Sequence, residues 1–167
     1  IYPVRLYGDP ILRKTATPVT HFGEELAALA EAMIETMYAH SGIGLAAPQI
    51  GLGKRLFITA ETRPEADEAE AGEAAGEAAG TGKPPSSRAE KRERWGVVNE
   101  HVIVNPVVLE QSGEQRGPDG CLSLPGLFVD ALPRAERVRL RYQDLAGATR
   151  ELVAHGRFAH VLQHELD

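Results

Sequence analysis

The sequence predicts an α+β fold in which antiparallel strands pack around a helix at the end of the chain. Residues 137–142 alternate strictly between apolar and charged, as a half-buried strand does. Helical spacing occurs near the start and at the end of the chain, so helices and strands do not alternate regularly as a parallel sheet requires. A length of 167 residues suits one domain, 1–167.

The first helix is expected at residues 24–39. Its apolar residues recur three and four positions apart, which places them on one helical face. These residues are Leu26, Leu29, Ala30, Met33 and Met37. Gly42 lies just past this segment, where helices often end. A strand is expected next, at residues 54–59.

Residues 61–94 differ in composition from the rest of the chain. The segment is rich in Ala, Gly, Glu, Pro and Ser, with almost no large apolar side chain. It cannot bury enough apolar surface to offset the entropy of ordering its backbone. We therefore expect an exposed or disordered insertion in the single domain at about 61–94, away from the functional site.

Two further strands are expected, at residues 101–110 and 137–142. Asn105-Pro106 interrupts the first strand, because proline cannot donate to a sheet. In the second strand, arginines alternate with apolar residues, which predicts one solvated and one buried face.

The end of the chain has the pattern of a strand followed by a helix. Residues 151–154 fit a short strand. From 156 to 167 the positions of Phe158, Val161 and Leu162 suit a helix.

Composition excludes several classes of protein. The net charge of −6 argues against a nucleic-acid site, and no stretch is apolar for the roughly 18 residues a membrane helix needs. The first residues lack the regions of a signal peptide. One cysteine, Cys121, fits a reducing compartment, so we expect a cytoplasmic protein.

The last residues carry a pattern of metal chemistry. His164-Glu165-Leu166-Asp167 matches the first four positions of H-E-x-x-H. On a helix, histidines four residues apart share a face and can bind one ion, and the glutamate can act as general acid or base. The fifth position would be 168, after Asp167, and a His-Glu pair alone is a weak signal.

Two other segments strengthen this hypothesis. GIGLAAPQ at 42–49 combines glycines that allow close backbone approach with a glutamine amide that can donate to a carbonyl oxygen. DGCLSLPG at 119–126 places the cysteine in a loop or strand end bounded by Gly and Pro, a position that suits a thiolate ligand.

Together the three segments resemble the peptide deformylase family, whose motifs are G-x-G-x-A-A-x-Q, E-G-C-x-S and Q-H-E-x-D-H. The sequence shows GIGLAAPQ at 42–49, DGCLS at 119–123 and QHELD at 163–167, in the same order. The resemblance extends over nearly the whole chain except 61–94. It implies a metal-dependent hydrolase that removes the N-terminal formyl group from formyl-methionyl nascent polypeptides. The partners that it implies are formylated nascent chains near the ribosome.

The resemblance also implies the metal site. Cys121, His164 and a second histidine one turn after His164 would bind one divalent ion, typically Fe²⁺, with Zn²⁺, Ni²⁺ or Co²⁺ as substitutes. A metal-bound hydroxide would attack the formyl carbon. Glu165 would take the proton of the water and pass it to the leaving amine.

Substrate contacts follow from the same resemblance. Gln49 and the backbone N–H of Leu122 would stabilise the oxyanion. Gly44 would hydrogen-bond the substrate backbone, and Ile43 and His160 would lie near the pocket for the methionine side chain.

The sequence departs from the family's pattern at three places: after Asp167, at Asp119 and in the long insertion at 61–94. The second histidine would be residue 168, so we expect the protein to continue beyond Asp167. An inactive relative, or a metal site that uses His160 in place of that histidine, would also fit the residues. Asp119 stands where the family has Glu, and it would pair with Arg134 less closely.

Two alternative functions remain open at this point. The first is a degenerate, non-catalytic binder of nascent N-termini. The second is a zinc endopeptidase of the H-E-x-x-H type, in which the third ligand would usually be His, Glu or Asp in place of Cys121.

Overall fold

The structure is a computed structural model of residues 1–167. It describes residues 2–6, 8–63, 87–120 and 128–166, without the side chains of 117–120 and 128–132.

The described strands form two antiparallel sheets. The larger sheet has the order β1-β2-β3-β6-β7 and the smaller pairs β4 with β5. Their bounds are β1 Gly44–Ala46, β2 Leu56–Thr62, β3 Val97–Ser112, β4 Gln115–Gly120, β5 Phe128–Arg134, β6 Arg137–Gln143 and β7 Thr149–His155.

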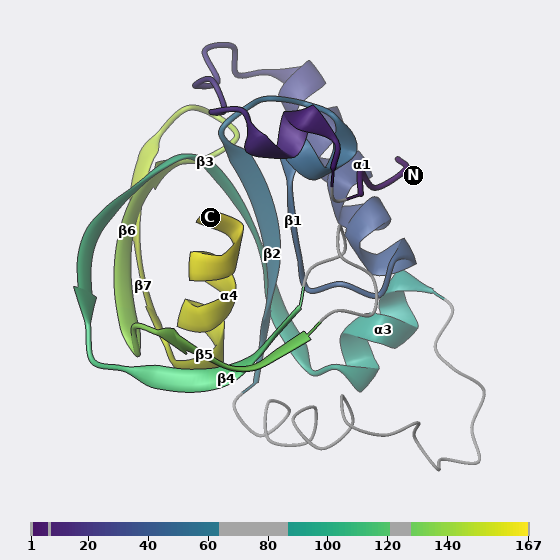
Figure 1. The fold of residues 1–167 in the computed structure, drawn as a ribbon. Coiled ribbons are helices and arrows are strands. Elements are labelled where there is room, and N and C mark those ends of the chain that lie inside the picture. Colours follow the sequence, from purple (N-terminus) through teal and green to yellow (C-terminus); the bar gives the residue numbers. More distant parts are fainter. Residues whose placement is uncertain (1, 7, 64–86, 121–127, 167) are drawn as a thin grey trace.

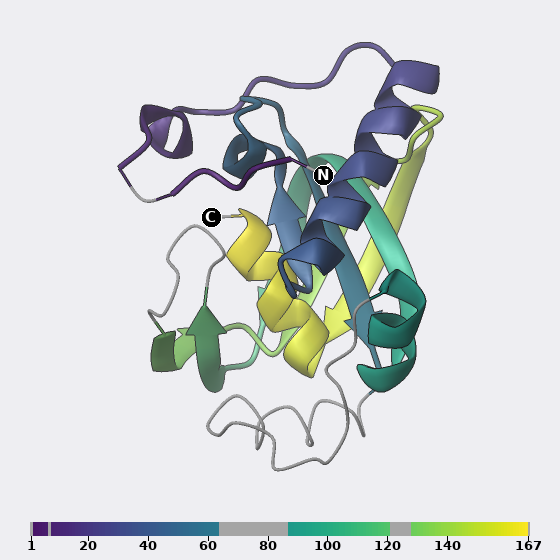
Figure 2. The ribbon, with the colours of Figure 1, turned by 90° about the vertical axis from the view of Figure 1, so that its right-hand side faces the viewer.

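Helices cover both faces of the larger sheet. The sheet curves around α4 (Gly156–Leu166), while α1 (Glu24–Ala39) and α3 (Arg88–Arg94) lie beyond β1 and β2 (Figures 1 and 2). Short 3₁₀ turns occur at η1 (Pro10–Arg13) and η2 (Ala47–Ile50). The prediction of an α+β fold with antiparallel strands around the helix that carries the His-Glu pair is confirmed.

Alternating residues of β2 divide the core in two. Leu56 and Ile58 pack with Met33 and Met37 of α1 on one face of the sheet. Phe57, between them, packs with Leu162 of α4 on the other face. Because successive side chains of a strand point to opposite faces, β2 is buried on both sides. The sheet therefore serves as a common support for two helices.

The predicted interruption of the 101–110 strand takes the form of a bulge. β3 continues through Asn105, which has a left-handed backbone (φ 49°), and the pairing with β6 shifts register between Val104 and Val107. The Asn105 side chain accepts from Val19 N–H (2.8 Å) and donates to Val19 C=O (2.9 Å) and Gln143 Oε1 (2.7 Å). The bulge thus ties the N-terminal segment to the sheet.

Part of the predicted 61–94 insertion has regular structure. Glu61 and Thr62 belong to β2, and 88–94 form helix α3, so the expected boundaries were too wide. A capping box starts α3: the hydroxyl of Ser87 accepts from Glu90 N–H (3.2 Å), and the Glu90 carboxylate accepts from Ser87 N–H (3.2 Å). Residues 64–86 lie outside the described residues.

The other expected helices and strands are present, some of them with different ends. The helix at 24–39 is confirmed, and the strand expected at 54–59 begins at Leu56 and ends at Thr62. The arginines of 137–142 lie on the more exposed face of β6, and Val138 and Leu140 are fully buried. Within the described part of the chain, every helix is too short or too polar to cross a membrane.

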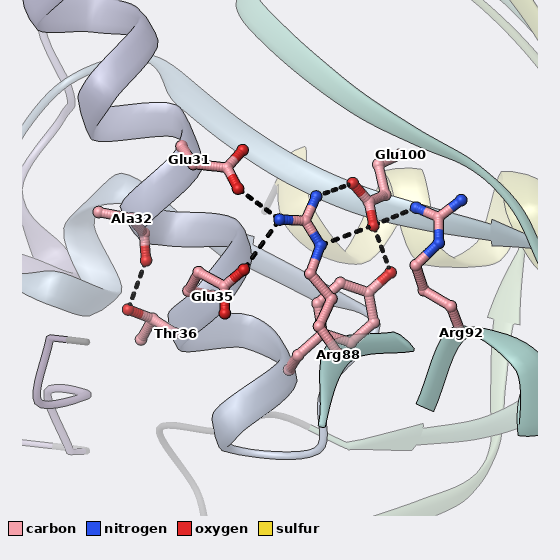
Figure 3. A network of polar contacts seen from close by, with 8 residues as sticks. Glu31, Ala32, Glu35, Thr36, Arg88, Arg92 and Glu100 are labelled. Atoms are coloured by element: carbon pink, nitrogen blue, oxygen red, sulfur yellow. Dashed lines mark hydrogen bonds and ion pairs between the residues drawn. The ribbon is translucent and has the colours of Figure 1, made fainter. Parts of the chain in front are cut away.

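An ion-pair network joins α3 to α1 and β3. Arg88 contacts Glu31, Glu35 (2.8 Å) and Glu100 (2.5 Å), as Figure 3 shows. Glu100 also accepts from Arg92 and from the hydroxyl of Tyr38 (2.9 Å). Burial tends to raise the pKa of Glu100, but the hydrogen bonds from Arg88, Arg92 and Tyr38 outweigh it and hold this pKa below its ordinary value.

Glu100→Gln is expected to lower the free energy of unfolding at neutral pH by about 2 kcal/mol, because two guanidinium groups lose their shared carboxylate. A carboxylate with a depressed folded pKa stabilises the protein above its unfolded pKa and loses this effect as the pH falls through the folded value. The difference between wild type and variant should therefore shrink below about pH 4. Urea unfolding at neutral and acidic pH measures it, and a difference independent of pH would contradict the account.

Candidate active site

Helix α4 is anchored at its first residue to the turn between β5 and β6. Gly156 N–H donates to Glu136 C=O (2.9 Å). The amide of Gln115, on β4, donates to Gly156 C=O (2.6 Å) and to Ala135 C=O (2.9 Å). These bonds fix where the helix begins relative to both sheets.

A second anchor lies directly before the His-Glu pair. Gln163 is 7% exposed, and its amide accepts from Ala135 N–H (2.9 Å) and donates to Ala135 C=O (2.8 Å). A buried amide bonded in both directions defines the rotation of α4 about its axis. His164 and Glu165 are therefore directed by contacts of their immediate neighbour.

Strand β1 presents alternate residues to the two helices. Leu45 is fully buried in the cluster that contains α1, whereas Ala46 packs against the cluster that contains α4. Gly44 shares the face of Ala46, because residues two apart in a strand lie on one side. A Cβ at Gly44 would lie 2.9 Å from Cδ and 3.1 Å from Cγ of Glu165. The absence of a side chain at Gly44 thus makes room for the Glu165 carboxylate.

The backbone of Gly44 points away from β2. Ile43 C=O accepts from Ala60 N–H (2.8 Å) and from Thr59 Oγ1 (3.0 Å), so Ile43 directs its polar groups toward β2. Polar groups of successive strand residues alternate between the two edges. The N–H and C=O of Gly44 therefore face the outer edge of β1, which is the terminal strand of the larger sheet among the described residues.

Gln49 lies in η2, directly after β1, and is 7% exposed. Its Oε1 accepts from Ala46 N–H (2.8 Å). Since the oxygen end accepts from the backbone, the NH₂ group is the donor end of this side chain. Gln49 and Gly44 are thus held on the same short segment.

The structure describes some of the remaining predicted site residues and not others. His160 is 4% exposed on α4, one turn before His164, and His164 and Glu165 are half-buried. Cys121, Leu122 and the side chain of Asp119 lie outside the described residues. No group of three His, Cys, Asp or Glu side chains suited to a metal occurs within the part of the chain that the structure describes.

Taken together, a His-Glu pair on a helix beside the polar edge of a short strand is an arrangement that suits a hydrolase. Comparison with known proteins agrees. A peptide deformylase of Thermus thermophilus is 46% identical over 167 residues, 100% of this chain and 77% of that protein. One from Thermotoga neapolitana is 38% identical over 100% of this chain and 80% of its own.

A solved structure shows the same fold. The crystal structure of peptide deformylase from Thermus thermophilus matches with a TM-score of 0.77 and 41% identity, covering 100% of this chain and 79% of that one. The family model described as polypeptide deformylase matches residues 1–167. The chain belongs to the polypeptide deformylase family, metalloenzymes that hydrolyse the N-terminal formyl group of nascent peptides. The two alternative functions find no support in these comparisons.

Sequence reasoning missed the residues that orient α4. Gln163 precedes the His-Glu pair, and a polar residue among the apolar positions Ala159 and Leu162 is a signal for a buried hydrogen bond. Gln115 has no comparable signal, because its role depends on how β4 folds back over α4.

Gly44→Ala is expected to reduce kcat/KM by at least about tenfold, because the new methyl group displaces the Glu165 carboxylate and small misplacements of catalytic groups are costly. Gly53→Ala is the matched control, since its Cβ would make only an ordinary contact with Ile11 at 3.5 Å. Steady-state hydrolysis of a formyl-methionyl peptide measures both. Equal activity of the two variants would show that Glu165 does not act from its place beside Gly44.

Proposed function

We propose that the chain binds the formylated N-terminus of a nascent polypeptide as an extended strand beside β1 and hydrolyses its formyl amide. The proposal rests on the contact between Gly44 and Glu165, because that contact brings a carboxylate to the face of β1 next to the outer edge where a peptide backbone can pair. Formylated chains emerge from the ribosome, so we place the reaction there, in the cytoplasm.

The proposed metal site consists of Cys121, His164 and a histidine that follows Asp167. We infer Fe²⁺ as the native ion, with Zn²⁺, Ni²⁺ or Co²⁺ as possible substitutes. One thiolate and two imidazoles are a donor set that such divalent ions accept. When bound, the ion supplies Lewis-acid activation of water at neutral pH.

Glu165 is the proposed general base and acid. Its carboxylate takes a proton from the attacking water and then passes that proton to the nitrogen of the leaving amine. The position beside Gly44 supports this role, because the scissile amide of a peptide paired with β1 would lie next to the same residue.

Gln49 and the backbone N–H of Leu122 are the proposed oxyanion donors. The bond from Ala46 N–H to Gln49 Oε1 supports this role, since it distinguishes the oxygen end from the donor end and restrains the side chain before substrate arrives. Gly44 would pair with the substrate backbone through its N–H and C=O. Ile43 and His160 would border the methionine side chain.

Glu165→Gln is expected to lower kcat by roughly 10²–10⁴-fold, because an amide cannot accept and return the proton. Glu151→Gln, which neutralises an exposed glutamate of β7, is the matched control and should keep full activity. Formate release from formyl-Met-Ala-Ser by the full-length protein is the measurement. A Glu165→Gln variant within about twofold of wild type would rule out this general base.

His164→Ala is expected to abolish stoichiometric metal binding, since it removes an imidazole ligand. His155→Ala changes an exposed histidine on β7 and should leave the metal content unaltered. Elemental analysis of the full-length protein after loading with Fe²⁺ or Ni²⁺ gives the metal per chain. Equal metal content in both variants would exclude His164 as a ligand.

A further inference from the structure

The turn between α1 and β1 leads directly to the residue that we propose to pair with substrate. Ser41 N–H donates to Tyr38 C=O (3.0 Å), and Gly42 N–H donates to Met37 C=O (2.9 Å). Ser41 has a left-handed backbone (φ 57°), which is unfavourable for a residue with a side chain. A strained turn needs support from its surroundings to persist, and Gly44 lies only a few positions after Ser41.

Lys91 contacts the start of this turn twice. It is 7% exposed, and its ammonium donates to Tyr38 C=O and lies 3.4 Å from Ser41 Oγ. Lysine is rarely buried to this extent unless its charge is compensated. Here the cation meets the carbonyl end of α1, where the helix dipole is negative, and lies 6.0 Å from the centre of the Trp95 ring.

The helix that carries Lys91 is held in place independently of the turn. Arg88 and Arg92, on either side of Lys91, bond to Glu100 of β3, and Arg88 also bonds to α1 through Glu31 and Glu35 (Figure 3). The Trp95 ring stacks on the ring of Tyr38, with 6.1 Å between the two ring centres. With α3 secured in this way, Lys91 can act as a fixed point for the turn.

The face of β1 that lies opposite Leu45 is occupied by Glu165. A shift of the turn would therefore move Gly44 relative to the substrate backbone, whereas Glu165 is carried by α4 and Gln49 by η2. The Lys91 ammonium bonds to Tyr38 and Ser41, at the start of the turn, so its influence on the reaction passes through the backbone of 41–44.

We propose that Lys91 is a positioning residue for substrate binding, which sets the place of Gly44 by clamping the turn between α1 and β1. This inference rests on the proposed function of β1 as the strand that pairs with the peptide. If Lys91 acted on stability alone, its replacement would leave KM unchanged, because the folded enzyme would still bind substrate normally.

Lys91→Met keeps the apolar stem and removes the charge. We expect KM for formyl-Met-Ala-Ser to rise about fivefold or more with kcat within about twofold of wild type, because the catalytic groups stay in place while the pairing strand loses definition. Backbone amides of residues 41–46 should exchange with solvent at least about tenfold faster. Both measurements use the full-length, metal-loaded protein.

Leu26→Ala is the control for stability. Leu26 is buried near the start of α1, whereas Tyr38 lies near its end, so the truncation weakens the fold at the far end of the helix. This variant should leave KM and the exchange of 41–46 unchanged at temperatures where it is folded. An unchanged KM in Lys91→Met, or an equal rise in both variants, would overturn the role of Lys91. If wild type released no formate, the proposed function would fail, and the exchange rates alone would still decide whether Lys91 clamps the turn.

Discussion

The contact between the end of α4 and β1 is the constraint on which the site depends. Glu165 can lie against the strand only because residue 44 is glycine, and α4 can bring it there only because Gln163 and Gln115 bind the helix to the turn before β6. A change in the rotation of α4 would direct Glu165 away from β1. The chemistry of the site therefore follows from hydrogen bonds made by residues outside it.

Strand β1 is positioned from both faces of the sheet. On one face Leu45 packs into the cluster with α1, and on the other Gly44 and Ala46 face α4. The ion pairs of Arg88 with Glu31 and Glu35 extend the first support, since they join α3 to α1, and Lys91 of α3 bonds to Tyr38 C=O where the turn toward β1 begins. A strand of three residues has little stability of its own, so its geometry is set by what packs on it.

The sequence predicted those parts that depend on local periodicity. The helix at 24–39, the alternating strand at 137–142 and the helix of the His-Glu pair have patterns that reflect burial on one face. β1 and β4 were not predicted, because β1 has only three residues and β4 contains glycine and proline, which are depleted in strands. Helix α3 was not predicted, because its sequence is highly charged and has no apolar face. Ion pairs with Glu31, Glu35 and Glu100 stabilise it instead. The family resemblance predicted the site residues, and the structure adds the proximity of Gly44 to Glu165; the roles of all these residues stay predictions.

We propose that Cys121 and His164 bind one ion beside Glu165 and the edge of β1. Anomalous scattering at the absorption edge of the metal, from crystals of the full-length protein, tests it most directly. The account predicts one strong peak within roughly 2.0–2.4 Å of the Cys121 sulfur and a His164 ring nitrogen, with the Glu165 carboxylate and Gly44 as neighbours. A peak with other ligands, or Cys121 far from His164 in the metal-loaded protein, would contradict it.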